Sequence, residues 1–423
     1  MNVEIKKSVL EGKADAPSSK SMTHRALILG SLAKGKTTIL SPLDSQDTQA
    51  TSKVLEHLGI KQEKNSKWII YGGDFKPPGK ELFCGESGTT IRFMTAVSAL
   101  VDGKCVLDGG GGLRRRPIKS LVDAVSQIGV RADSNHGYPP VTVYGKGKIP
   151  GGETSLPGDI SSQFVSALLL VSPLAENPVK LKISNRLESK PYVDMTLDAM
   201  KSFGVTAQKE SDYSCLSAPL GDYQPISYNV EGDWSSAAFL LASGALCGDV
   251  TVRNLNIESP QADRQIITIL EAMGAQIEKR GSIINATESQ LKGIKYDMRD
   301  CPDLFPIVAA LCSRAEGKST LTGLKRLRIK ESDRIESMVM GLKQMGAEVT
   351  TEENLLRIKG GDLRGAVIDP FNDHRIAMSF GVLGMVANGK TTITNSECVK
   401  KSYPGFWDCI ERLGANIRRD VNE

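Results

Sequence analysis

Six helix-like stretches along the chain end in the same short pattern, an apolar residue, a glycine and a second apolar residue. The glycines are spaced 68–75 residues apart: Gly59, Gly129, Gly204, Gly274, Gly346 and Gly414. A second pattern, an apolar helix followed by a polar turn and a β-branched strand, recurs six times with almost the same period. A sustained period of this kind is typical of a repeated supersecondary unit. The sequence therefore predicts six copies of one α/β unit.

Each unit is predicted to contain a strand, an apolar helix A, a second strand, an amphipathic helix B and a β-hairpin. The glycine after helix B lies where a left-handed C-terminal cap is expected. The sixth unit ends in residues 415–423, where its hairpin should begin, while residues 1–10 contain a surplus strand. We therefore expect the N-terminal strand to complete the C-terminal units, with both chain ends in one domain.

Composition excludes several classes of protein. The 423 residues, 40% of them hydrophobic, are enough for two or three domains with sizeable cores. The net charge of +4 comes from 53 basic and 49 acidic residues without a long basic run, so small anions are expected as partners rather than nucleic acid or a membrane. Eight scattered cysteines favour neither a zinc site nor a disulfide framework. With no export or membrane-spanning segment, we expect a cytoplasmic protein.

The candidate chemistry lies at the predicted helix starts. These segments are rich in Ser, Asp, Asn and Gly, which also cap helices for purely structural reasons. Four prolines are expected in the first turn of a helix B: Pro117, Pro191, Pro260 and Pro404. Helix N-termini bind anions, and cations placed there oppose the helix dipole, so anionic ligands explain such cations better than stability does. The cations are Lys20, Arg25, Arg92, Arg114, Arg115, Arg116, Lys330, Arg334, Arg375, Lys400 and Lys401.

Two carboxylates stand among these cations, Asp303 at a predicted helix start and Glu331 beside Lys330. Ionised carboxylates suit general-base work, and a lysine crowded by cations loses its proton more easily. The segment GESGTT (85–90) lacks the Gly-Lys-Ser/Thr that a nucleotide-binding P-loop requires, so ATP use is not expected.

At these residues the chain resembles the 5-enolpyruvylshikimate-3-phosphate synthase family. The resemblance covers essentially the whole chain, with the motifs PSSKSMTHRAL, LDSQDT, GESGTTIRF, LRRRPI, GDISSQFVSALL, SKPY, GDWSSA, PDLFP, IKESDR, NDHRIAM and KSYPGFW in the family's order. It implies transfer of the enolpyruvyl group of phosphoenolpyruvate to the 5-hydroxyl of shikimate 3-phosphate, with release of phosphate, in the shikimate pathway that leads to aromatic amino acids. It also implies that no metal or organic cofactor takes part.

The resemblance implies a fold as well. Family members form a two-domain inside-out α/β barrel with three βαβαββ units per domain around a pseudo-threefold axis. Here the N-terminal domain would span residues 15–231, and residues 1–14 would join residues 232–423 in the C-terminal domain. A monomer is expected.

Site residues follow from the same motifs. For shikimate 3-phosphate the resemblance implies Lys20, Ser21, Arg25, Ser161, Ser162, Gln163, Ser189, Asp303, Arg326 and Lys330. For phosphoenolpyruvate it implies Lys20, Gly88, Arg116, Gln163, Arg334, Arg375 and Lys401. Asp303 would accept the proton of the 5-hydroxyl, and Glu331 would serve the methylene carbon, with Lys20 and Lys401 sharing proton transfer.

Two positions depart from the commonest family pattern. Glu86 stands where many members carry asparagine, which puts the shape and charge of the phosphoenolpyruvate pocket in question. Arg326 stands where some members have an asparagine near the substrate phosphate, so it could strengthen or replace that contact. Gly88 matches the glycine beside which glyphosate competes with phosphoenolpyruvate in the family, and glyphosate binding is expected.

Three other functions fit the sequence less well. The sister enzymes transfer enolpyruvyl to UDP-N-acetylglucosamine. They have a Lys-Asn pair where this chain has Lys20–Ser21, and they usually carry a cysteine in the loop that here is DGGGGLRRRP (108–117). Both differences disfavour this function. A noncatalytic scaffold would be expected to have lost some of Lys20, Asp303, Glu331 and Lys401, all of which are present. A nucleic-acid-binding repeat protein does not fit the modest charge and the 5% aromatic content.

Overall fold

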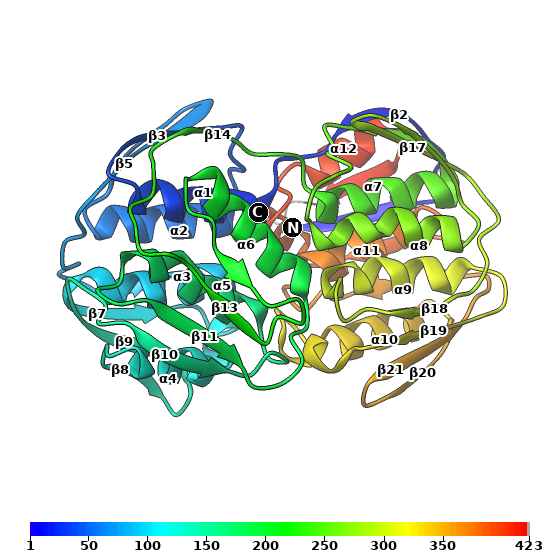
Figure 1. Cartoon of the computed structure of the whole chain (residues 1–423). Coiled ribbons are helices and arrows are strands. Elements are labelled where there is room, and N and C mark those ends of the chain that lie inside the picture. The colour runs from blue at the N-terminus through cyan, green and yellow to red at the C-terminus, as the bar shows by residue number, and fades with distance from the viewer. Residues whose placement is uncertain (421–423) are drawn as a thin grey trace. The chain divides into compact units, whose positions relative to one another are not determined.

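The computed structural model of the chain describes residues 1–420 and divides into two compact units (Figure 1). The N unit consists of residues 18–230. The C unit joins residues 1–17 to the chain from Glu231 onward. No helix among the described residues is long and apolar enough to cross a membrane.

The N unit contains three copies of the repeat. Its α-helices are α1 (Lys20–Leu32), α2 (Gln46–His57), α3 (Gly88–Val97), α4 (Lys119–Gln127), α5 (Ser162–Val171) and α6 (Lys190–Ser202), with the 3-10 helices η1 (Ser98–Leu100), η2 (Leu113–Arg115) and η3 (Ser172–Leu174). Its strands are β3 (Gly35–Leu40), β4 (Lys61–Lys64), β5 (Lys67–Gly72), β6 (Leu82–Phe83), β7 (Asp102–Asp108), β8 (Ala132–Asn135), β9 (Tyr138–Lys146), β10 (Gly152–Leu156), β11 (Val179–Ile183), β12 (Gln208–Lys209), β13 (Cys215–Ser217) and β14 (Ser227–Asn229).

The C unit contains the other three copies. Its α-helices are α7 (Trp234–Cys247), α8 (Ile266–Ala272), α9 (Phe305–Arg314), α10 (Arg334–Gln344), α11 (His374–Gly384) and α12 (Phe406–Arg412), with the 3-10 helices η4 (Ala262–Gln265), η5 (Pro302–Leu304), η6 (Lys325–Ile329) and η7 (Ser396–Lys401). Its strands are β1 (Asn2–Lys6), β2 (Leu10–Asp15), β15 (Gly248–Arg253), β16 (Gln276–Arg280), β17 (Ile283–Thr287), β18 (Lys295–Asp297), β19 (Lys318–Thr322), β20 (Glu348–Glu352), β21 (Leu355–Lys359), β22 (Val367–Ile368), β23 (Thr391–Ile393) and β24 (Asn416–Asp420).

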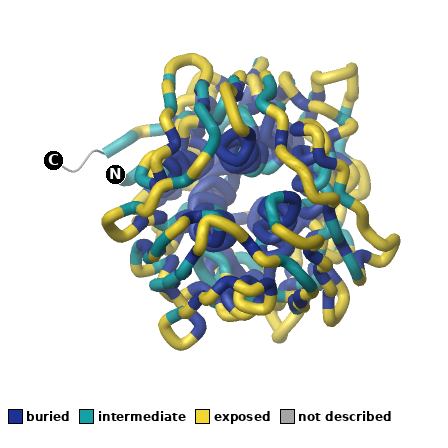
Figure 2. The backbone as a smooth tube through the Cα atoms, turned by 60° about the vertical axis from the view of Figure 1, so that its left-hand side comes forward, coloured by how far each residue is buried: buried dark blue, intermediate teal, exposed yellow. Residues whose placement is uncertain are grey.

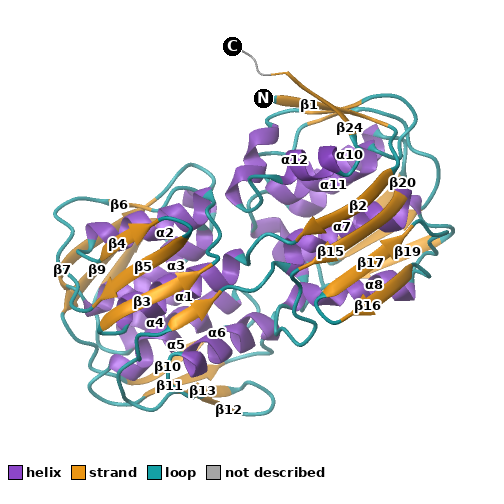
Figure 3. Ribbon diagram, turned by 90° about the horizontal axis from the view of Figure 1, so that it is seen from above, coloured by secondary structure: helices purple, strands orange, loops and turns teal. Residues whose placement is uncertain are grey.

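In both units the helices lie inside and the sheets outside. The apolar A helices are almost wholly buried: in α7, for example, Trp234 and Phe239 are inaccessible to solvent. Each sheet packs one face on the helices and turns the other towards solvent, as the burial colours and the ribbon show (Figures 2 and 3). This is the inside-out α/β architecture that the family resemblance implies.

All six sheets share one topology. Each is four-stranded, and its first two strands are parallel while the next pairings are antiparallel. The sheet β6-β7-β9-β8 is an example: the parallel strands β6 and β7 are joined through α3, and the hairpin β8–β9 follows α4. Parallel neighbours need a crossover of this kind, usually a helix, whereas a hairpin needs only a short turn.

Two strands have exchanged sheets where the chain passes between the units. Strand β2 precedes α1 in the chain but pairs in parallel with β15 of the C unit. Strand β14 precedes α7 but pairs in parallel with β3 of the N unit. Each unit therefore receives its missing first strand from the segment that leads into the other unit.

The N-terminal strand β1 completes the sixth sheet. It pairs antiparallel with β23 on one side and with β24 on the other. Its side chains Val3 and Ile5 are inaccessible to solvent. The expectation that the N-terminus completes the C-terminal units is confirmed by these pairings, although residues 1–15 contain two strands rather than the single surplus strand predicted.

The glycine after each helix B is confirmed as a left-handed cap. All six repeat glycines have φ between +86° and +110°. After α2, for example, Gly59 donates its N–H to the carbonyl of Glu56, and Ile60 donates to that of Leu55. A side chain at these positions would strain the backbone, which explains why glycine recurs there.

The proline prediction is correct at one position and wrong at three. Pro191 lies in the first turn of α6. The other three prolines lie before their helices, because the chain first passes through a loop or a 3-10 turn. Helix B begins at Lys119 after Pro117, at Ile266 after Pro260 and at Phe406 after Pro404.

The pairing of β1 generates a stability prediction. Replacing the buried Ile5 by alanine should lower the free energy of unfolding by about 2–5 kcal/mol, because it leaves a cavity between β1 and the helices. The exposed neighbour Lys6→Ala should change it by less than about 0.5 kcal/mol. Urea denaturation of both variants measures the difference; equal stabilities would show that the N-terminal strand is not part of the C-unit core.

Candidate active site

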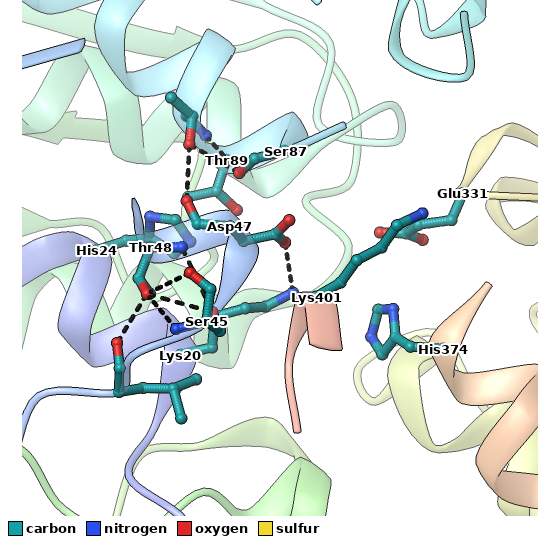
Figure 4. Close-up of polar contacts among 12 residues, drawn as sticks. Lys20, His24, Ser45, Asp47, Thr48, Ser87, Thr89, Glu331, His374 and Lys401 are labelled. Atoms are coloured by element: carbon teal, nitrogen blue, oxygen red, sulfur yellow. Dashed lines mark hydrogen bonds and ion pairs between the residues drawn. The ribbon is translucent and has the colours of Figure 1, made fainter. Parts of the chain in front are cut away.

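The N-terminus of α1 carries a lysine that is paired with a carboxylate of the N unit. Ser19 caps the helix by accepting the Met22 N–H, which leaves Lys20 as its first residue. The Lys20 Nζ lies 2.9 Å from the Asp47 Oδ2, and both side chains are largely buried (Figure 4). Asp47 lies in the first turn of α2, whose start is fixed by a capping box between Ser45 and Thr48. Lys20 is therefore held in place by a carboxylate from the next helix.

Arg25 is buried between α1 and α6. Its Nε donates to the Thr196 hydroxyl at 2.9 Å, and its Nη1 and Nη2 donate to the carbonyls of Ser21 and Tyr192. The guanidinium also lies over the Phe93 ring. Burial lowers the pKa of Arg25 to about 10, yet the group remains cationic near neutral pH. Arg25 thus brings positive charge to this end of the unit and orients the first turn of α1.

Gln163 is oriented from both ends by α3. Ser161 caps α5, and Gln163 is the second residue of that helix. Its Oε1 accepts from the Arg92 Nη1 at 2.5 Å, and its Nε2 donates to the Thr89 hydroxyl at 2.8 Å. The amide cannot rotate without losing both hydrogen bonds.

The serines predicted for substrate binding lie at helix starts. Ser161 and Ser162 stand at the start of α5 and are mostly buried, whereas Ser21 in α1 is half-buried. Ser189, just before α6, adopts a left-handed backbone with φ 56° and ψ 43°. Such a conformation costs a non-glycine residue on the order of 1–3 kcal/mol and is commonest at functional sites.

Gly88 and Arg116 are in contact. A Cβ at Gly88, the first residue of α3, would lie 2.5 Å from the Arg116 Nη1. Of the three consecutive arginines only Arg116 is buried. Arg114 is exposed and pairs with Asp108, which explains it without a ligand and corrects its place among the anion-binding candidates. Arg115 and Lys400 are exposed as well.

In the C unit one buried arginine gathers three carboxylates. Arg334, the first residue of α10, is 1% exposed. Its Nε donates to the Asp373 Oδ2 at 2.8 Å, its Nη1 to the Asp303 Oδ1 at 2.8 Å and its Nη2 to the Glu331 Oε2 at 2.7 Å. These carboxylates come from η5 and from the segments before α10 and α11, so the arginine holds three separate segments together.

Asp303 is surrounded by cations. Besides Arg334, the Arg375 Nη2 lies 3.1 Å from its Oδ2, and the Lys330 Nζ lies 3.5 Å from its Oδ1. Burial alone would raise the pKa of Asp303, but the charges of Arg375, Lys330 and Arg334 outweigh it and hold this pKa well below its usual range. Asp303 is therefore ionised near neutral pH, as the sequence predicted for a carboxylate in a basic site.

The pKa of Lys330 is lowered as well, but in a lysine this shift disfavours the charged form. Burial lowers the pKa of its ammonium to about 8; Asp303 opposes this shift, while the cations Arg334 and Arg326 add to it. A lysine of this kind exchanges its proton close to physiological pH.

The remaining predicted C-unit residues lie on neighbouring segments. The Lys401 Nζ donates to the carbonyl of Asn372 at 2.6 Å, next to the start of α11. Arg375 is the second residue of α11, which Asp373 caps. Arg326 is buried in η6 and donates to the Arg299 carbonyl at 2.8 Å.

Several residues that shape the site were not assigned such a role from the sequence. In the sequence, Asp47 and Asp373 look like ordinary residues of a helix start. Their ion pairs are not visible there, because they join residues that lie 27 and 39 positions apart. Asp263 is buried and hydrogen-bonded to Ser235; burial and the nearby Asp303 raise its pKa to about 7. The only signal in the sequence was the acidic residue itself, next to motifs rich in cations.

Comparison with known proteins places the chain in a family. Residues 5–410 match the family model described as EPSP synthase (3-phosphoshikimate 1-carboxyvinyltransferase). The chain belongs to this family. Among its relatives, the 3-phosphoshikimate 1-carboxyvinyltransferase of Dehalococcoides mccartyi is 42% identical over 424 residues and that of Methanocorpusculum labreanum is 40% identical over 426 residues, with 99–100% of each chain covered.

Solved structures of the family have the same fold. An EPSP synthase from Acinetobacter baumannii is 29% identical and superimposes with a TM-score of 0.83, covering 99% of this chain and 100% of that one. The enolpyruvyl transferase NikO from Streptomyces tendae superimposes with a TM-score of 0.81 at 15% identity, covering 100% and 99% of the two chains, which is a likeness of fold alone.

The cation cluster around Asp303 predicts an unusual lysine titration. After reductive ¹³C-methylation, the Lys330 resonance should titrate with a midpoint near pH 8, because burial disfavours its charge. In Asp303→Asn the midpoint should move lower still, since the carboxylate that stabilises the ammonium is gone. The Lys330→Arg variant, which lacks this resonance, assigns the signal. A midpoint at the ordinary lysine value of 10.5, or an upward move in Asp303→Asn, would contradict this description.

Proposed function

We propose that this protein transfers the enolpyruvyl group of phosphoenolpyruvate to the 5-hydroxyl of shikimate 3-phosphate and releases phosphate. The observation that carries the proposal is the cluster in which Arg334 and Arg375 share the carboxylate of Asp303, with Glu331 and Lys330 beside it. The family description and the names of the relatives give the same reaction. Neither substrate needs a cofactor for this chemistry, because phosphoenolpyruvate is itself the activated donor.

The charges of the substrates account for the cations. Two phosphates and two carboxylates have to be bound, and arginine forks and helix N-termini suit both groups. We assign shikimate 3-phosphate to Lys20, Ser21, Arg25, Ser161, Ser162, Gln163, Ser189, Asp303, Arg326 and Lys330. We assign phosphoenolpyruvate to Lys20, Gly88, Arg116, Gln163, Arg334, Arg375 and Lys401.

Asp303 is proposed as the base that accepts the proton of the 5-hydroxyl. In the substrate-free protein it is a weak base, because three cations stabilise its ionised form. Anions of the substrate compete for the same N–H donors of Arg334 and Arg375. Once these donors bind a substrate carboxylate or phosphate, less positive charge acts on Asp303, and its pKa rises towards the ordinary range. Substrate binding therefore makes the base competent at the moment when it is needed.

The proton balance assigns the other groups. As the 5-oxygen bonds to C2 of phosphoenolpyruvate, its proton passes to Asp303, and the methylene carbon C3 gains a proton, which gives a tetrahedral ketal phosphate. Loss of a proton from the new methyl group and cleavage of the C2–O bond to phosphate then form the product. Glu331 is proposed to serve C3, with Lys20 and Lys401 sharing proton transfer. We further propose that the protein acts as a monomer in the cytoplasm and that glyphosate competes with phosphoenolpyruvate beside Gly88.

Phosphate release tests the proposed reaction. Incubated with phosphoenolpyruvate, the protein should release phosphate only when shikimate 3-phosphate is added. UDP-N-acetylglucosamine, the acceptor of the sister enzymes, should not replace it. Release without any acceptor, or release that depends on UDP-N-acetylglucosamine, would refute the assignment.

A second experiment tests the base. Asp303→Ala, and the closer match Asp303→Asn, should still bind shikimate 3-phosphate in calorimetry but turn over about 10²–10⁴-fold more slowly, because neither side chain can accept the hydroxyl proton. The control is Asp362→Asn, which changes an exposed carboxylate that pairs with Arg314 in the same unit. Turnover of the Asp303 variants equal to that of this control would remove Asp303 from the mechanism.

A further inference from the structure

The side chain of Glu86 lies against a loop of four consecutive glycines, Gly109–Gly112. Its Oε1 accepts the Gly112 N–H at 3.3 Å. A Cβ on Gly110 would lie 2.1 Å from the Glu86 Oε1, and a Cβ on Gly112 would lie 2.5 Å from its Oε2. Any side chain at these two positions would therefore displace the carboxylate.

Backbone conformation does not explain the glycines at 110 and 112. Gly112 has φ −68° and ψ −41°, which every residue adopts easily, and none of the four glycines has a φ in the left-handed region. Gly111, between them, has nothing within 4 Å of an added Cβ. The missing side chains at 110 and 112 are thus accounted for by the space that Glu86 occupies.

Glu86 connects the two loops that bring Gly88 and Arg116 together. It precedes Ser87, the cap of α3, and Gly88, the first residue of that helix. The residue that donates to it, Gly112, caps η2, which leads directly into Arg116. The same two loops are also joined by the Gly110 N–H, which donates to the Gly85 carbonyl at 2.8 Å.

We propose that Glu86 is a positioning residue that braces the glycine loop, so that the Arg116 guanidinium is held over Gly88. The inference rests on the proposed function, in which Arg116 binds phosphoenolpyruvate. Glu86 itself does not have to touch the substrate. Glu86 fixes the distance between the start of α3 and the loop that carries Arg116. It does so through a hydrogen bond and through close packing that the glycines permit.

Kinetics of single variants test the brace. Glu86→Ala should raise KM for phosphoenolpyruvate on the order of tenfold or more, since misplacing a binding group by about an ångström weakens its contact strongly. KM for shikimate 3-phosphate should stay near the wild-type value. Glu86→Gln, which keeps the shape and the Oε1 acceptor, should restore most of the affinity. An equal rise in both KM values, or no rescue by glutamine, would overturn the proposal.

Double variants test whether Glu86 acts through Arg116 and the glycines. Glu86→Ala should add little to the loss already caused by Arg116→Ala, because coupled residues are not additive. Gly112→Ala should raise KM for phosphoenolpyruvate as Glu86→Ala does, and combining the two should cause no further rise. The matched control Gly111→Ala should behave as wild type. Full additivity in either pair would contradict the proposed coupling.

Hydrogen exchange separates this proposal from the proposed function. In the full-length protein without substrates, Glu86→Ala should speed amide exchange across residues 109–116, whereas Gly111→Ala should not. Unchanged exchange in Glu86→Ala would overturn the brace even in an active enzyme. A wild-type protein that releases no phosphate with shikimate 3-phosphate would instead refute the proposed function and leave the exchange result to be judged by itself.

Discussion

The ion-pair network of Arg334 is the interaction on which the C-unit site depends. A buried guanidinium is costly unless its charge and its N–H groups are satisfied, and here three carboxylates satisfy them. The network fixes the start of α10 against the start of α11 through Asp373 and also orients Asp303 and Glu331. Because the two proposed proton-transfer groups share one arginine, its guanidinium orients their carboxylates relative to each other.

The same network couples the two carboxylates of the proposed reaction. Asp303 pairs with Arg334 and Arg375, and Glu331 pairs with the same Arg334. In the proposed reaction, substrate anions that bind these arginines would take donors from both carboxylates. The cations proposed to bind the substrates would therefore also control the proposed bases, which would link binding to chemistry without a separate switch.

Regular features could be predicted from the sequence because they repeat. The six left-handed glycines and the place of β1 follow from comparing one unit with the next. The places of β2 and β14 do not follow from their own patterns, since each precedes a helix A and is equally compatible with either sheet. The expectation that residues 1–14 join the C-terminal domain and that the N-terminal domain extends to residue 231 came from the family resemblance. Pairing depends on where the chain passes between units, and a local pattern does not contain that information.

The site was predictable as a set of residues but not as a set of contacts. The motifs pointed to Asp303, Arg334 and Arg375. In contrast, Asp373 looks like a simple helix cap in the sequence but pairs with Arg334, and Arg114 looks like an anion-binding residue but pairs with Asp108. Whether a charge is paired inside the protein depends on side chains far away in sequence. Glu86 is a further case, because its partner is a run of glycines that would ordinarily be interpreted as a flexible loop.

The titration of Asp303 tests the link between binding and base strength most directly. With ¹³C-labelled aspartate and Asp303→Asn for assignment, its carboxyl signal can be followed over pH in the free protein and with saturating phosphoenolpyruvate, without the second substrate. We expect a pKa well below the ordinary range in the free protein, because of the surrounding cations, and a clear rise when the substrate is bound. An unchanged or lower pKa of Asp303 with phosphoenolpyruvate would show that the arginines do not give up their hydrogen bonds to the carboxylate in order to bind the substrate.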